Sequence, residues 1–190
     1  YGPNDNFHLE NSHVLPAMLR KIYLAKCLHT GDWEAVRRDL SRRPVNQVDG
    51  AAPESEIQQI LSCYGIYPDR VELWGTGRPL REFLWSEEMA DATVFIMEQV
   101  DFKDTYPQGR RDIRNCHINI GTGKEITIAG LASLIKQTVG FEGEICFDAS
   151  KPDGTMRKLT DVTKLHALGW HHQVEIEEGV QRLYAWYLTH

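Results

Sequence analysis

The chain has 190 residues, of which 42% are hydrophobic and 25% are charged, and its formal net charge is −6. This composition is typical of a globular protein, and the length suits one domain, with or without a sizeable insertion. The negative charge argues against a nucleic-acid-binding protein, whose affinity depends on neutralising phosphates, but it allows a local basic pocket. No apolar run approaches the roughly 18 residues of a membrane-spanning helix. We therefore expect neither a nucleic acid nor a membrane as partner.

Four cysteines lie far apart and form no CxxC pair. This spacing is poor for a metal and gives no disulfide framework, which predicts reduced thiols, a cytoplasmic protein and no metal site. The chain opens at Tyr1 in a turn-rich Tyr-Gly-Pro sequence. We interpret this beginning as a position partway through a longer protein.

Three helices are predicted in the first third of the chain, each with apolar side chains at helical spacing. They run from Ser12 to Gly31, from Trp33 to Leu40 and from Pro53 to Gly65. Ser12 and Asp32 can cap the first two helices with their side-chain oxygens. We interpret residues 27–70 as a helical insertion that is peripheral to the main fold.

Short strands and helices alternate in the rest of the chain. Strands are predicted at residues 71–74, 80–84, 117–120 and 145–148, and helices at residues 86–100, 127–139, 161–169 and 177–188. Ser86, Thr127 and Asp161 can cap the first three of these helices. The pattern predicts a mixed α/β fold with short strands and several helices, without a full parallel sheet.

A dinucleotide-binding fingerprint is missing from the sequence. The turn Gly121-Thr122-Gly123 follows a predicted strand, but it lacks the third glycine and the downstream acid that binds a ribose. The sequence also lacks a Ser…Tyr-x-x-x-Lys set. We therefore expect no Rossmann domain in these residues, and the turn is a weak candidate for binding phosphate.

Several stretches point together to one family. They are Tyr1-Gly-Pro-Asn-Asp-Asn-Phe-His, Asn11-Ser-His-Val, Trp74-Gly-Thr-Gly-Arg-Pro-Leu-Arg-Glu-Phe-Leu, His117-Ile-Asn-Ile-Gly-Thr-Gly, Phe147-Asp-Ala-Ser-Lys-Pro-Asp-Gly-Thr, Arg157-Lys-Leu and Leu168-Gly-Trp. In this order they resemble the GDP-L-fucose synthases, which are extended short-chain dehydrogenases/reductases. The resemblance covers nearly the whole chain except the 27–70 segment. One departure is Trp85, where many family members carry a histidine.

The resemblance implies that residues 1–190 are the C-terminal substrate-binding domain of such an enzyme, with its Rossmann domain absent. The family epimerises GDP-4-keto-6-deoxy-D-mannose at C3 and C5 and then reduces C4 with NADPH. The family's NADP(H) is bound mainly by the missing N-terminal domain, which also carries the Tyr/Lys pair and the epimerising cysteine. The chain alone is therefore expected to be inactive, and the full-length enzyme is expected to be a homodimer.

His13 matches the catalytic histidine of the family in Asn-Ser-His. An imidazole can both give and take a proton near neutral pH, as two epimerisations require. The resemblance implies catalysis by His13 and allows its contact with the cofactor. Without the motif, a histidine near a helix start is more often a structural hydrogen-bonding residue.

Five further residues match substrate-binding positions of the family. They are Lys21, Trp74, Arg81, Asp153 and Lys158. The resemblance assigns the cations to the diphosphate, with Arg81 able to bind two phosphate oxygens at once. Each residue also has an ordinary alternative: a solvated charge for the cations, a core side chain for Trp74 and a turn residue for Asp153.

Two other functions stay open at this point. One is the substrate domain of a related GDP- or UDP-sugar epimerase or dehydratase, which would bind a different nucleotide sugar. The other is a non-catalytic module that binds a nucleotide sugar or a protein. A coding sequence that supplies a glycine-rich βα turn and Tyr-x-x-x-Lys upstream would favour an enzyme over such a module.

Overall fold

The computed structural model describes residues 1–107, 109 and 112–190. Its α-helices are α1 Val14–His29, α2 Trp33–Arg42, α3 Glu54–Cys63, α4 Ser86–Gln99, α5 Ile128–Val139, α6 Thr163–Ala167 and α7 Ile176–Thr189, with a 3-10 turn at Phe102–Thr105. Its strands are β1 Arg70–Trp74, β2 Leu80–Arg81, β3 Ile126–Thr127, β4 Glu144–Asp148 and β5 Arg157–Lys158. The fold is thus mixed α/β with short strands, as predicted. None of the helices in these residues is long and apolar enough to cross a membrane.

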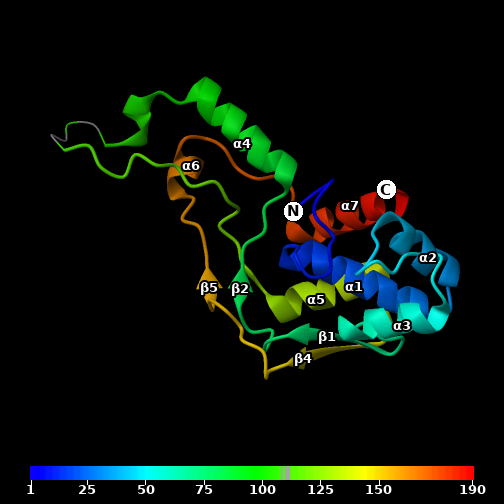
Figure 1. The fold of residues 1–190 in the computed structure, drawn as a ribbon. Helices are drawn as coiled ribbons and strands as arrows, with labels where there is room; N and C mark the ends of the chain where they lie inside the picture. Colours follow the sequence, from blue (N-terminus) through cyan, green and yellow to red (C-terminus); the bar gives the residue numbers. More distant parts are fainter. Residues whose placement is uncertain (108, 110–111) are drawn as a thin grey trace.

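The strands form two small sheets. Strands β1 and β4 pair in parallel from Arg70 opposite Glu144 to Trp74 opposite Asp148. The second sheet has β2 in the middle. Strand β2 is antiparallel to β3 on one side and parallel to β5 on the other. Helices α1, α2, α3, α5 and α7 lie together beside β1 and β4, whereas α4 and α6 lie apart from them on the far side of β2 and β5 (Figure 1).

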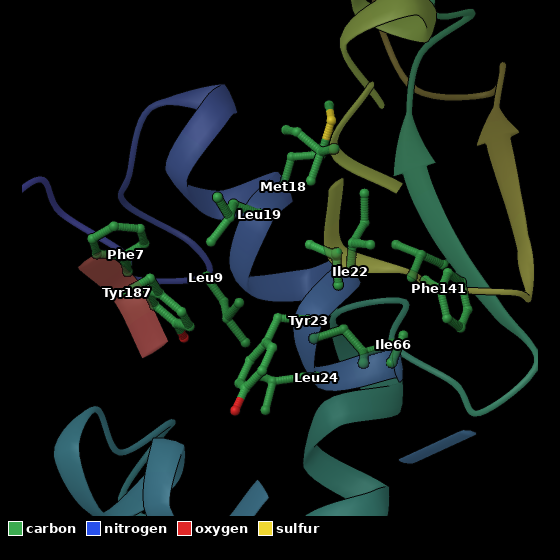
Figure 2. Packing of buried hydrophobic residues seen from close by; sticks show 14 of the residues in the cluster. Phe7, Leu9, Met18, Leu19, Ile22, Tyr23, Leu24, Ile66, Phe141 and Tyr187 are labelled. Atoms are coloured by element: carbon green, nitrogen blue, oxygen red, sulfur yellow. The ribbon is translucent and has the colours of Figure 1, made fainter. Parts of the chain in front are cut away.

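Helix α1 is the centre of the main core. Its apolar side chains are buried on several faces, and Leu19, Ile22 and Leu24 have no exposed surface. Figure 2 shows these side chains packed among residues from distant parts of the chain, including Ile66 and Phe141. Burial of each such side chain contributes roughly 1.5–3 kcal/mol, so tertiary packing stabilises this helix.

The 27–70 segment is helical, as predicted, but its expected place at the periphery is wrong. Its residues Ile57, Leu61 and Ile66 are at most 1% exposed and belong to the same core cluster as α1. The apolar face that the sequence pattern identified is therefore buried against the main fold. That the segment is an insertion stays a prediction.

A buried charged cluster ties four parts of the chain together. On α1, Arg20 is 1% exposed, and its guanidinium pairs with the carboxylate of Asp39 on α2 at 2.9 Å. The same guanidinium donates to the carbonyls of Phe7 and Arg43, and the Tyr187 hydroxyl of α7 donates to the other carboxylate oxygen of Asp39. Figure 2 shows the ring of Phe7 beside that of Tyr187.

Two of the predicted helix caps are confirmed. The Asp32 side chain accepts a hydrogen bond from the Ala35 amide, and Thr127 accepts one from the Gly130 amide. The other caps differ. Residue Ser86 is the first residue of α4, after Trp85, and no side-chain bond caps that helix. Ser12 lies one residue before the cap position of α1.

The predicted strand at 117–120 does not form. The ammonium of Lys164 on α6 donates to the carbonyls of Asn115 and His117, so a side chain takes acceptors that a neighbouring strand would use. Strand β2 is also shorter than expected, because Glu82 bonds to loops instead of continuing a ladder. The helix expected from Asp161 begins at Thr163, whose amide donates to the Asp161 carboxylate.

Substitution Asp39→Ala is expected to destabilise the fold by at least about 3 kcal/mol, because it leaves the buried Arg20 charge without its partner. The matched control is Glu34→Ala on the same helix, which removes an ion pair with Arg38 whose acidic side chain is 90% exposed. That change should cost no more than about 1 kcal/mol. Urea unfolding followed by circular dichroism measures both, and equal losses would contradict the role given to Asp39.

Candidate functional site

Two adjoining hollows lie between α1, β1 and the start of α5. The larger, of about 510 Å³, is lined by Leu9, Glu10, Val14, Ala17, Met18, Lys21, Asn46, Ile60, Cys63, Tyr64, Leu73, Trp74 and Ile128. The smaller, of about 220 Å³, is lined by Val14, Trp74, Gly77, Pro79, Arg81, Ile128 and Asp153. Because Val14, Trp74 and Ile128 line both, the two hollows meet along one side. Together they have room for a ligand with an apolar part and an anionic part.

Trp74 stands where the two hollows meet. It is the last residue of β1, opposite Asp148 of β4, and it is 73% exposed. The Lys151 ammonium lies 5.6 Å from the centre of its ring. The alternative of a core tryptophan is therefore excluded, and a large indole face is available to a flat or sugar-like ligand.

Lys21 is half-buried in the larger hollow. Burial lowers the pKa of its ammonium group, since the charged form loses solvation. Within the described part of the chain no carboxylate lies at salt-bridge distance from it, and the acid among the residues that line this hollow is the exposed Glu10. An anionic ligand in this hollow would supply the counter-charge.

Arg81 lines the smaller hollow, and Lys158 lies beside it on the neighbouring strand. Strands β2 and β5 pair them directly, so their side chains leave the same sheet at the same level. One Arg81 nitrogen donates to the Leu80 carbonyl at 2.7 Å, and neither cation pairs with an acid among the described residues. Lys158 itself lines neither hollow but lies on the exposed surface next to Arg81. Two adjacent like charges repel, so a shared anion would stabilise both.

Asp153 holds the turn between Trp74 and Arg81. Its two carboxylate oxygens accept hydrogen bonds from the Thr76 amide and hydroxyl, each at 2.6 Å. These bonds from Thr76 lower the pKa of Asp153. Gly75 adopts a positive φ of 84° in this turn, which favours glycine. The ordinary turn role of Asp153 is therefore observed, and its contact with a substrate stays a prediction.

His13 lies at the edge of the site rather than inside it. It occupies the cap position of α1, directly before Val14, which lines both hollows. Its carbonyl accepts from the Ala17 amide at 3.2 Å, whereas the exposed ring makes no hydrogen bond within the described residues. The alternative of a structural hydrogen-bonding imidazole is thus not what the geometry shows. By contrast, His8 accepts from the Glu10 and Asn11 amides and shapes the preceding loop.

The turn Gly121-Thr122-Gly123 binds a carboxylate of this chain. One Glu82 oxygen accepts from the Thr122 and Gly123 amides at 2.7 Å, and the other accepts from the Thr160 amide at 3.0 Å. Burial raises the pKa of Glu82, but bonds from Thr160, Gly123 and Thr122 outweigh it, so the pKa lies below its usual range. The amides of the turn are therefore occupied and do not fit a cofactor phosphate.

Sequence reasoning missed several cavity residues. Asn46 and Tyr64 lie in the 27–70 segment and line the larger hollow, with the Asn46 amide donating to the Tyr64 hydroxyl at 3.1 Å. The only signal for them was local: an asparagine in a polar connector and a tyrosine in the last turn of a predicted amphipathic helix. Nothing in that pattern brings them to α1. Glu82 was missed as well, because its partners Thr122 and Thr160 lie 40 and 78 residues further along the chain.

Comparison with known proteins shows what the chain is similar to. Residues 47–121 match the family model described as the NAD dependent epimerase/dehydratase family. The chain is 40% identical to GDP-L-fucose synthase 1 of Arabidopsis thaliana over 188 residues, which are 99% of the chain and 43% of that protein. It is 39% identical to the GDP-L-fucose synthase of Escherichia coli (strain K12), covering 99% of the chain and 46% of that protein. The chain is therefore a homologue of part of the GDP-L-fucose synthases and spans about half the length of these relatives.

Solved structures support the same fold. A GDP-6-OMe-4-keto-L-xylo-heptose reductase from C. jejuni is 40% identical, with a TM-score of 0.87, over 100% of this chain and 51% of that one. MlghC, a GDP-mannoheptose C4 reductase from Campylobacter jejuni with NADP bound, is 38% identical with a TM-score of 0.82, over 98% and 50%. A GDP-L-fucose synthetase from Naegleria fowleri bound to NADP, at 23% identity and a TM-score of 0.64 over 100% and 44%, shows the fold alone.

Substitution Glu82→Gln is expected to reduce stability at pH 7, and the difference between the original protein and the variant should shrink progressively as the pH falls below about 4.5. A carboxylate whose pKa is lowered by folding stabilises the fold above its unfolded value of about 4.5, and this stabilisation is lost as the pH falls through the lower folded value. The free energy of unfolding should therefore fall more steeply with acid in the original protein than in the variant. The control Glu98→Gln, on the exposed surface of α4, should keep the original slope. Parallel curves for the original protein and Glu82→Gln would contradict the role of Glu82.

Proposed function

We propose that this chain is the substrate-binding part of an NADP-dependent enzyme that acts on a GDP-sugar, and that the full-length protein is a GDP-L-fucose synthase. Such an enzyme epimerises GDP-4-keto-6-deoxy-D-mannose at C3 and C5 and reduces C4 to give GDP-L-fucose. The observation that carries the proposal is the pair of joined hollows, with Lys21 in one, Arg81 in the other and Trp74 between them. The chain alone is expected to bind substrate without turnover.

Binding of the diphosphate follows from the unpaired cations. The planar guanidinium of Arg81 can bind two phosphate oxygens at once, and Lys158 beside it adds a second charge. Lys21 would approach the same group from the larger hollow. The exposed indole of Trp74 would then cover a face of the ligand, and Asp153 would keep Trp74 and Arg81 at a fixed separation through Thr76.

His13 is proposed as one of the two groups that transfer protons in the epimerisations; the other, on the opposite face of the sugar, is the cysteine that the resemblance assigns to residues outside this chain. The C4 ketone of the substrate acidifies the protons at C3 and C5, so a base removes each proton and an acid returns one on the opposite face. The free imidazole of His13, at the edge of the hollows, can perform such a proton transfer. NADPH, when bound, supplies the hydride that reduces C4. The resemblance allows His13 to contact this cofactor, with the rest of its binding assigned to residues outside this chain.

A GDP-heptose reductase is a second candidate. The Campylobacter jejuni enzymes that act on GDP-heptoses match the chain with TM-scores of 0.82–0.87, including the 27–70 segment, whereas the Naegleria fowleri GDP-L-fucose synthetase matches with 0.64. This likeness supports a site wall of similar build in this chain and in the Campylobacter jejuni enzymes. Preference for a seven-carbon over a six-carbon GDP-sugar separates this candidate from the first. Either enzyme would be consistent with the expected homodimer in the cytoplasm.

Substitution Arg81→Ala is expected to weaken GDP-sugar binding about tenfold or more, because charge-assisted hydrogen bonds contribute roughly 1.5–3 kcal/mol each. The matched control is Arg78→Ala, three residues earlier, whose exposed side chain bonds to Thr76 and lines neither hollow. Titration calorimetry with GDP-sugar measures both. An unchanged dissociation constant for Arg81→Ala would contradict the assignment of Arg81 to diphosphate binding.

Substitution His13→Asn in the full-length enzyme is expected to slow product formation by about 10²–10⁴ while GDP-sugar binding stays unchanged. Deuterium uptake at C3 and C5 in heavy water reports the proton transfers directly. The control His29→Asn changes a histidine at the opposite end of α1, where it bonds to the Pro68 carbonyl. Normal exchange and normal product yield with His13→Asn would rule out its catalytic role.

A further inference from the structure

We infer that Asn6 and His8 together position His13 for proton transfer, by holding the loop that leads into α1. The inference rests on the proposed function, because it takes the imidazole of His13 to be a group that exchanges a proton with the sugar. Neither Asn6 nor His8 lines the two joined hollows. Both are therefore positioning residues, which act on the reaction through the backbone of Asn11.

The backbone fixes the place of His13. The ring of His13 makes no hydrogen bond within the described residues, so no side-chain partner there holds it. Its carbonyl accepts from the Ala17 amide at 3.2 Å, which ties His13 to the first turn of α1 on one side. On the other side only Ser12 separates His13 from Asn11. The place of the ring therefore depends on how firmly Asn11 is held.

Asn11 is held from two directions by side chains of the preceding loop. The Nδ1 atom of His8 accepts hydrogen bonds from the amides of Glu10 and Asn11, each at 3.2 Å. The side-chain amide of Asn6 donates to the Asn11 carbonyl at 3.1 Å. We call these three bonds the loop clamp. They fix both the amide and the carbonyl of a residue two positions before His13.

The chemistry of the loop clamp defines what each side chain must supply. The Oδ1 atom of Asn6 accepts from the His8 amide at 3.0 Å, so turning the side-chain amide over would set one N–H group against another. The Nδ1 atom of His8 accepts hydrogen bonds only without a proton, which places the proton of the neutral ring on Nε2. The loop clamp therefore needs an acceptor at the position of Nδ1, and it does not need an imidazole as such.

The core anchors the same loop independently of the loop clamp. Phe7 and Leu9, on either side of His8, are 3% and 7% exposed, and the Phe7 carbonyl accepts from the buried guanidinium of Arg20 at 3.2 Å. Loss of the loop clamp should therefore leave the fold in place and release residues 10–12, which lead to His13. A misplacement of about 1 Å in a reacting group can reduce a rate about 10²-fold.

Substitution His8→Ala in the full-length enzyme is expected to lower kcat about tenfold or more, because His13 is no longer held toward the sugar. The affinity of the chain for GDP-sugar should stay within about threefold, since Lys21, Trp74 and Arg81 lie on α1, β1 and β2. His8→Asn should restore kcat to within about threefold, because its Oδ1 branches from Cγ as Nδ1 does and accepts the same bonds. The matched control is His29→Ala, which removes a ring bonded to the Pro68 carbonyl at the other end of α1 and should keep kcat.

Substitution Asn6→Ala should lower kcat in the same direction. Because Asn6 and His8 both act through Asn11, the double variant should lose less than the product of the two single losses. Hydrogen exchange of the 190-residue chain reports the loop clamp without turnover. His8→Ala should speed exchange at the Glu10 and Asn11 amides, and His8→Asn should preserve the original rates.

An unchanged kcat for His8→Ala would overturn the inference, as would equal losses for His8→Ala and His8→Asn. Weaker GDP-sugar binding in place of a lower kcat, or equal exchange rates at the two amides, would also overturn it. If His13→Asn slows the reaction but His8→Ala does not, the inference is wrong while the proposed function stands. If the original full-length enzyme does not turn over GDP-sugar, or if His13→Asn reacts normally, the proposed role of His13 and the inference fail together.

Discussion

The buried contact between Arg20 and Asp39 is the constraint on which the rest of the structure depends. A guanidinium and a carboxylate withdrawn from water are stable only with good geometry and further hydrogen bonds, and both are present here. The contact joins α1 to α2, to the loop at Phe7 and to α7 through Tyr187. It fixes the position of α1, and another face of α1 forms the wall from Val14 to Lys21. The shape of the hollow thus depends on a polar contact that is itself outside the hollow.

Acids and cations have separate roles around the site. The carboxylates of Asp153 and Glu82 accept hydrogen bonds from backbone amides and the Thr76 hydroxyl. These bonds shape the loops around β2. The cations Lys21 and Arg81 are left without acidic partners in the described part of the chain. A chain with a net charge of −6 therefore still forms a local positive site. This separation is what an anionic substrate requires.

Much of the fold could be predicted from sequence because its signals are local. The caps at Asp32 and Thr127 depend on residues three positions away, and the helices around them follow the spacing of apolar side chains. The predicted strand at 117–120 does not form, and Lys164, far along the chain, donates to the carbonyl of its first residue, His117. The burial of the 27–70 segment depends equally on contacts that no local pattern contains.

The candidate site also contains residues that sequence motifs identify and residues that only the fold brings to the site. The family resemblance selected Lys21, Trp74 and Arg81, and the fold places them around joined hollows although they come from different elements. Their actual roles in a substrate complex stay predictions. The resemblance could not identify Asn46, because the motifs that carry it lie outside the 27–70 segment. It also gave no sign that Glu82 occupies the amides of the Gly121-Thr122-Gly123 turn.

A crystal structure of the chain with bound GDP-sugar would test the central claim most directly. We expect the diphosphate between the ammonium of Lys21 and the guanidinium of Arg81, with the indole of Trp74 against the ligand and the sugar directed toward His13. A diphosphate held elsewhere on the surface, with both hollows empty, would contradict the shared binding site.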